Sequence, residues 1–157
     1  DSLGTEATIE VGEVQVMSAG TGIAHSEYNA SVTEALELFQ IWIEPKSYGI
    51  APRYDQKRFN FEENRDVLLP IITPKGIEGT LFIHQEASLY LGYFTKTSTE
   101  EYSITDGHGV YLLVVEGEVS VGDQKLSKRD ALSVTNENKI EIVIQGGSRL
   151  LFIDVPL

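Results

Sequence analysis

Hydrophobic and polar residues alternate along most of the chain with the period of two that predicts β-strands. Glycine, asparagine and aspartate residues, which favour tight turns, separate these short segments. No segment has convincing helical periodicity, although residues 61–69 allow one helical turn. Many short strands at regular spacing predict an all-β barrel or sandwich. The predicted strands are 7–11, 13–17, 36–43, 80–86, 88–95, 110–115, 118–121, 131–134, 140–144 and 149–155.

Two β-rich blocks flank residues 45–64, which contain two prolines and several charges but little periodicity. We predict that this stretch is a long ordered connection between two halves of the molecule. The expected division is 1–45, a connection over 46–78, and 79–157. The phrases VEGEVSVGDQKLSKRDALSV (115–134) and IEVGEVQVMSAG (9–20) both resemble parts of the cupin pattern, which hints at an internal duplication.

Composition narrows the possible classes of protein. The 157 residues are enough to bury a core, and no apolar run reaches the length of about 18 residues that a membrane span needs. The absence of cysteine excludes disulfides and thiolate metal sites, and it favours an intracellular, cytoplasmic location. A net charge of −12 repels phosphates, so neither direct nucleic-acid binding nor a membrane partner is expected.

His25 and Glu27 are the residues with the clearest chemical potential. Side chains two residues apart on an extended segment point to the same face. A neutral imidazole and a carboxylate on one face suit a divalent metal. The glycine-rich residues 18–22 immediately before them predict a tight loop that brings the pair into a barrel mouth. From spacing alone, a hydrogen-bonded pair without metal is the commoner reason for such a pattern.

The other histidines are interpreted differently. His84 and Glu86 form a second pair on a predicted strand, but no glycine loop precedes them, so a structural pair is expected. His108 is predicted to be solvated, because it lies in a glycine-rich loop. Residues 130–142 contain no histidine, so at most one metal centre is expected, in the N-terminal half. Trp42 is expected to pack in the core or at its rim.

The block GEVQVMSAGTGIAHSE (12–27) is the most specific part of a resemblance to the pirin family of bicupins. The resemblance covers almost the whole chain and includes the turn over residues 1–4. It continues through LFQIWIEP (38–45), PRYDQKRF (52–59), IHQEASLYLG (83–92) and LLFIDVPL (150–157). It implies two double-stranded β-helix barrels, of which the N-terminal one is incomplete in this chain and the C-terminal one lacks metal ligands.

The family resemblance also implies a metal site. Pirins hold a mononuclear iron, or another divalent transition metal, by three histidines and one glutamate, and the last two of these ligands match His25 and Glu27. The first two belong to a His-x-His motif that is expected to precede Asp1. With two of four ligands, this chain is expected to bind metal weakly or not at all. Unpaired strand edges suggest a homodimer or a strand-swapped dimer.

The resemblance implies a metal-dependent dioxygenase whose intact form acts on a small aromatic molecule, a flavonol such as quercetin. In that reaction Glu27 is the expected catalytic residue, acting as a base for the substrate hydroxyl as well as a metal ligand. Two alternatives stay open at this point. One is a non-catalytic regulatory or protein-binding bicupin, and the other is an inactive truncated fragment.

Overall fold

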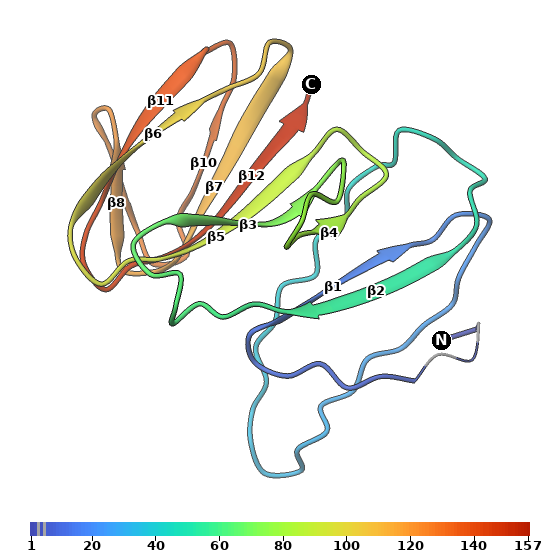
Figure 1. Ribbon diagram of the computed structural model, residues 1–157. Coiled ribbons are helices and arrows are strands. Elements are labelled where there is room, and N and C mark those ends of the chain that lie inside the picture. Colours follow the sequence, from blue (N-terminus) through green and yellow to red (C-terminus); the bar gives the residue numbers. More distant parts are fainter. Residues whose placement is uncertain (3, 5) are drawn as a thin grey trace.

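The computed structural model describes residues 1–2, 4 and 6–157, and these residues contain β-strands, turns and irregular segments but no helix (Figure 1). The all-β prediction is therefore confirmed. The strands form three sheets of two, six and four strands. No helix in the described part of the chain is long and apolar enough to cross a membrane. The turn expected over residues 1–4 includes Leu3, which lies outside the described residues.

The two larger sheets are built by the C-terminal part of the chain. The six-stranded sheet has the order β10-β7-β12-β5-β3-β4, and the four-stranded sheet has the order β6-β11-β8-β9. Neighbouring strands are antiparallel, except that β3 and β4 are parallel. The strands of the first sheet are β3 (Leu68–Thr73), β4 (Leu81–Phe82), β5 (Ser88–Tyr93), β7 (His108–Glu116), β10 (Ala131–Val134) and β12 (Arg149–Pro156). Those of the second are β6 (Ser98–Ser103), β8 (Glu118–Val121), β9 (Gln124–Ser127) and β11 (Lys139–Ile144).

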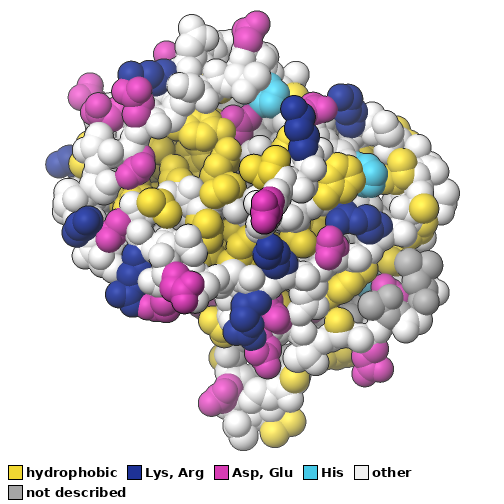
Figure 2. Space-filling view, viewed as in Figure 1, with side chains coloured by type: hydrophobic (Ala, Val, Ile, Leu, Met, Phe, Trp, Pro, Cys, Tyr) yellow, Lys and Arg dark blue, Asp and Glu magenta, His cyan; other side chains and the backbone are white. Residues whose placement is uncertain are grey.

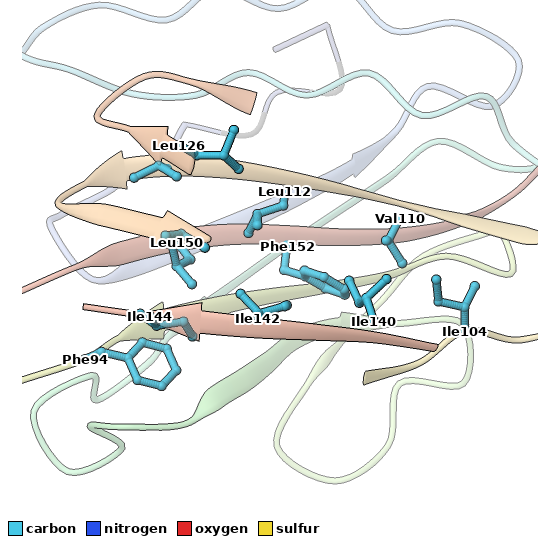
Figure 3. Packing of buried hydrophobic residues seen from close by; sticks show 12 residues of the cluster. Phe94, Ile104, Val110, Leu112, Leu126, Ile140, Ile142, Ile144, Leu150 and Phe152 are labelled. Atoms are coloured by element: carbon cyan, nitrogen blue, oxygen red, sulfur yellow. The ribbon is translucent and has the colours of Figure 1, made fainter. Parts of the chain in front are cut away.

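The space between these two sheets is filled by a first hydrophobic core, shown in Figure 3. Strand β12 shows how the two-residue period builds it. Leu150 and Phe152 point into the first core, while Leu151 and Ile153 belong to a second core on the other face of the same sheet. Both faces of β12 are thus covered, which explains why its sequence is an almost continuous apolar run.

The second core lies where the smallest sheet covers the outer face of the six-stranded sheet. This small sheet pairs β1 (Glu13–Ser18) with β2 (Arg53–Arg58) in antiparallel register. Val16 is buried in the second core, and Val14 packs against it. Because side chains alternate along a strand, the opposite face of β1 carries polar residues away from this core.

Several predicted elements are absent or shorter than expected. Residues 7–11 and 36–43 form no strand, because they pair with no other strand among the residues that the structure describes. Trp42 is 86% exposed, so the expectation that it packs in the core or at its rim is wrong. Residues 61–67 form turns rather than a helical turn. Only Leu81–Phe82 of the expected strand 80–86 is paired.

Four strands of the structure were not predicted from the sequence: β2, β3, β6 and β9. Strand β2 (RYDQKR) and strand β6 (STEEYS) are mostly polar, so they lack the alternation that marks a half-buried strand. They are strands because a neighbour offers backbone partners. The predicted connection over residues 45–64 contains strand β2. Strand β3, which follows it, is part of the six-stranded sheet. The division at residues 45 and 78 stays a prediction.

Candidate functional site

The polar face of the β1–β2 sheet is the surface on which the candidate site is built. Gln15 lies opposite Gln56 in the register, and Met17 lies opposite Tyr54. The other face is fixed by Val14 and Val16 at the second core. This anchoring forces the side chain of Gln15 outward, onto a surface shared with the β2 residues.

The predicted glycine loop directly follows β1. The amide of Gly22 donates to the carbonyl of Ala19 at 2.8 Å, which closes a tight turn. Gly20 has a φ of +56°, and a Cβ atom there would lie 2.2 Å from the carbonyl oxygen of Ile50. Only glycine fits such a close approach. The loop therefore packs directly against the backbone that leads into β2. This contact sets the direction of the segment that follows the loop and carries His25 and Glu27.

His25 and Glu27 lie on the irregular, exposed segment after this loop. Ser2 fixes the segment at Ala24, because its amide donates to the Ala24 carbonyl at 2.7 Å and its Oγ accepts from the Ala24 amide at 3.0 Å. Nε2 of Gln15 donates to Oε1 of Glu27 at 2.6 Å. The segment is thus held on both sides of His25. Its placement at a barrel mouth stays a prediction.

A second chain of hydrogen bonds runs along the same face. Tyr54 donates to Oε1 of Gln56 at 2.6 Å, and Nε2 of Gln56 donates to Oε2 of Glu13 at 2.8 Å and to the carbonyl of Thr8 at 2.9 Å. Burial raises the pKa of Tyr54, and the negative charges of Glu13 and Glu27 raise it further. The Tyr54 phenol therefore stays protonated at neutral pH and lies within electrostatic reach of Glu27.

The donor chemistry of this site fits a divalent transition metal, since imidazole and carboxylate groups are suitable ligands. The number of donors is smaller than a closed site needs. Within residues 1–2, 4 and 6–157, no group of three or more His, Cys, Asp or Glu side chains is placed to hold a metal ion. His25 and Glu27 are thus a candidate pair of ligands rather than a complete set.

His84 and Glu86 have different partners. The ring of His84 packs edge-on against Phe82, with centroids 4.6 Å apart, while Glu86 accepts from Nζ of Lys46 at 2.7 Å. The hydrogen bond from Lys46 lowers the pKa of Glu86. Both residues line a small open hollow of about 150 Å³. His84 and Glu86 thus contact different neighbours, and the expectation of a structural pair stays a prediction.

His108 is not a solvated loop residue, and that prediction is wrong. It begins β7, and Nδ1 lies 2.5 Å from Oδ1 of the buried Asp154. Tyr102 donates to the other oxygen of Asp154 at 2.7 Å. Asp154 was the signal in the sequence for a buried polar partner. It lies two residues after the core residue Phe152, so its carboxylate is on the same face of β12.

The three sheets and the two cores define the class of this protein, an all-β cupin. The family model described as the quercetinase C-terminal cupin domain matches residues 70–155, and the pirin family model matches residues 1–43. The chain belongs to the pirin family.

Two curated relatives show the extent of the similarity. Quercetin 2,3-dioxygenase of Escherichia coli (strain K12) is 40% identical over 156 residues, which cover 99% of this chain and 66% of that protein. A pirin-like protein of Caulobacter vibrioides is 34% identical over 168 residues, which cover 98% of this chain and 66% of that protein. The chain spans 66% of the length of these relatives.

Solved structures show the same relationship. The crystal structure of bacterial pirin YhhW from Escherichia coli in complex with nickel(II) superposes with a TM-score of 0.91 at 38% identity. The match covers 98% of this chain and 66% of that one. The fold of this chain is therefore that of a pirin over nearly its entire length.

Proposed function

We propose that this chain belongs to a metal-dependent dioxygenase that acts on flavonols such as quercetin. The observation that carries the proposal is the placement of His25 and Glu27 beside a structured polar face, held there by Ser2 and Gln15. Relatives that share 40% of its residues are named quercetin 2,3-dioxygenases. In the proposed reaction O₂ is the oxidant, and both of its atoms enter the products.

His25 and Glu27 are the proposed ligands of a divalent transition metal, with Fe(II) as the proposed ion and nickel(II) as the ion in the related Escherichia coli pirin. When bound, such a metal supplies Lewis-acid and redox chemistry at open coordination positions. Residues 1–45 contribute this half of the site, and residues 79–157 act as a structural cupin. The lack of cysteine fits a reducing, cytoplasmic location.

Glu27 is the proposed base. Its carboxylate is exposed and within reach of an entering molecule, so it can accept the proton of a flavonol hydroxyl. The raised pKa of Tyr54 keeps its phenol neutral at neutral pH, and its O–H donates to Oε1 of Gln56 at 2.6 Å. Glu27 thus presents a hydrogen-bond acceptor to the hydroxyl groups of a flavonol.

The test compares quercetin loss and O₂ consumption by an intact-length version of the protein loaded with Fe(II), with His25→Ala as the variant and His84→Ala as the matched control. We expect one O₂ consumed per quercetin in the wild type. The His25→Ala variant should lose more activity than the roughly 10–100-fold loss that follows removal of a hydrogen-bond partner of a metal ligand. His84→Ala should keep its activity, because its ring packs edge-on against Phe82 and it is not one of the proposed ligands. Undiminished turnover in His25→Ala would exclude this function.

A second candidate is a non-catalytic, protein-binding pirin. It is favoured by large apolar side chains that are exposed on the irregular N-terminal segment, including Val32 at 99%, Trp42 at 86% and Tyr48 at 74%. In that case iron-loaded protein would leave quercetin unchanged, yet form a stoichiometric complex with a defined partner. The variant Trp42→Asp would weaken that complex without affecting metal content.

A further inference from the structure

An open hollow of about 510 Å³ lies between the small β1–β2 sheet and the six-stranded sheet. Its walls come from the turn before β1, the end of β2 with the connection to β3, the end of β5 and the start of β12 (Figure 1). We propose that this hollow binds a small organic anion with an aromatic ring and a single carboxylate, and that Arg149 recognises the carboxylate. The proposal is independent of the candidate metal pair, because neither His25 nor Glu27 lines the hollow.

One wall of the hollow is aromatic and apolar. Phe59 is buried in the second core, and Phe61 and Leu91 pack against that core. The rings of Phe59 and Phe61 are stacked, with centroids 6.3 Å apart and an angle of 26° between their planes. The amide of Phe59 donates to the carbonyl of Gly12 at 2.9 Å, which ties the turn before β1 to this wall. A preformed wall of this kind suits the flat ring of a ligand, and the volume is within the roughly 300–1,000 Å³ of typical small-molecule sites.

Arg149 supplies a positive charge to the hollow. It lies opposite Tyr93 in the register of β12 and β5, and its guanidinium carbon is 4.9 Å from the centroid of the Tyr93 ring. Among the residues that the structure describes, no carboxylate forms an ion pair with Arg149, whereas each of the other arginines has one. Glu116, its neighbour on β7, binds Lys128 at 2.8 Å instead. Packing on Tyr93 therefore holds the guanidinium while its N–H groups stay available to a ligand.

The other charged side chains of the hollow already have partners. Arg58 forms an ion pair with Glu10, and Glu62 forms one with Arg65. Among the described residues that line the hollow, Arg149 is thus the charged group left without an ionic partner. One such guanidinium matches one carboxylate, which it can hold through two parallel hydrogen bonds. The net charge of −12 disfavours phosphates and other multiply charged anions, so the chemistry favours an aromatic monocarboxylate.

The experiment titrates the full chain with 2-naphthoate by calorimetry, in wild type, Arg149→Gln and the control Lys125→Gln. Lys125 is exposed on β9 and does not line the hollow, and its substitution changes the net charge by the same amount. We expect the wild type to bind naphthoate saturably and Arg149→Gln to bind it about 10–100-fold more weakly, because a hydrogen bond to a charged group contributes that much. Lys125→Gln should match wild type. A chelator in the buffer makes the result independent of the candidate metal pair.

Two analogues separate the contribution of the charge from that of the ring. The neutral 2-naphthamide keeps the ring without the charge, and acetate keeps the carboxylate without the ring. Both should bind to the wild type at least about tenfold more weakly than naphthoate. Arg149→Gln should bind naphthoate and naphthamide with similar affinities, because the variant has no charge with which to distinguish them.

Three results would each overturn the proposal. The first is a wild type that does not bind naphthoate saturably, and the second is equal affinity of the wild type for naphthoate and naphthamide. The third is an unchanged affinity for naphthoate in Arg149→Gln. Unfolding curves show whether each variant is folded. If Arg149→Gln is not, Arg149→Met provides the same test with the same expected loss, because methionine is also unbranched and uncharged.

Discussion

Nδ1 of His108 lies 2.5 Å from Oδ1 of Asp154, inside the C-terminal sandwich. The two side chains are 16% and 7% exposed, so most of this interaction is shielded from water. Tyr102 donates to the second oxygen of the same carboxylate at 2.7 Å. Asp154 is therefore a shared acceptor between β7 and β6, and a buried carboxylate is tolerated here because both of its oxygens are hydrogen-bonded.

Replacing Asp154 with alanine should destabilise the protein strongly. The change leaves two partly buried donors, on His108 and Tyr102, without their acceptor, and we expect the unfolding free energy to fall by about 3 kcal/mol. Chemical denaturation measures this loss. The control is Asp123→Ala in an exposed turn, which should change the unfolding free energy by less than about 0.5 kcal/mol. Equal effects of the two substitutions would contradict a structural role for the network.

Stability should also fall in alkaline solution because of Tyr102. Burial, followed by hydrogen bonds with Tyr90 and Asp154, raises the pKa of Tyr102. Above about pH 10 the unfolded chain loses the phenolic proton while the folded protein keeps it. The folded state then binds more protons, so the unfolding free energy decreases as pH rises, by at most about 1.4 kcal/mol per pH unit from this group.

The difference between wild type and Tyr102→Phe isolates this contribution. Denaturation curves from about pH 9 to 11.5 should show a shallower decline for Tyr102→Phe, because phenylalanine has no proton to lose. Tyr28→Phe is the control, since Tyr28 is 85% exposed and its substitution should leave the wild-type slope unchanged. Identical slopes for wild type and Tyr102→Phe would show that the phenol ionises as freely in the folded state as in the unfolded chain.

Gly20 and Gly49 make a matched pair for testing the glycine loop. Both have positive φ, +56° and +70°, but only at Gly20 would a Cβ atom meet backbone, at 2.2 Å from the Ile50 carbonyl. Gly49→Ala should cost about 1–2 kcal/mol for the left-handed backbone alone. Gly20→Ala should cost more and displace the segment that carries His25.

Unfolding curves and limited proteolysis of residues 19–29 measure the two effects separately. Faster cleavage of this segment in Gly20→Ala than in Gly49→Ala is the expected result, because the clash lifts the loop off the backbone that leads into β2. If the two variants behave alike, the close contact at Gly20 does not hold the loop in solution.

Aromatic residues of the two halves should respond very differently to truncation. Phe152 is fully buried in the first core (Figure 3), and Phe152→Ala should lower the unfolding free energy by about 3–5 kcal/mol. Trp42 is 86% exposed, so Trp42→Ala should have an effect below about 0.5 kcal/mol. Figure 2 shows hydrophobic side chains gathered in patches on the visible face, with charged side chains around them. A large loss of stability in Trp42→Ala would mean that this residue is covered in solution.

The site was only partly predictable from the sequence. The spacing of His25 and Glu27 and the glycine loop before them indicated a candidate pair and the turn that directs it. Gln15 was not recognised, because its contact with Glu27 joins residues 12 positions apart through a fold that alternation alone does not reveal. His108 was misjudged for the same reason, since its partner Asp154 lies 46 positions away.

Local chemistry by itself determined the all-β class and most strands of the C-terminal cupin, because a two-residue apolar period leaves a strand one way to bury its side chains. Tertiary structure alone decided which extended segments became strands. The polar β2 is a strand because β1 offers it backbone partners, whereas the apolar residues 36–43 pair with no strand in the described part of the chain. A strand requires backbone hydrogen bonds to a neighbouring strand, and the sequence of one segment does not determine which segment that neighbour is.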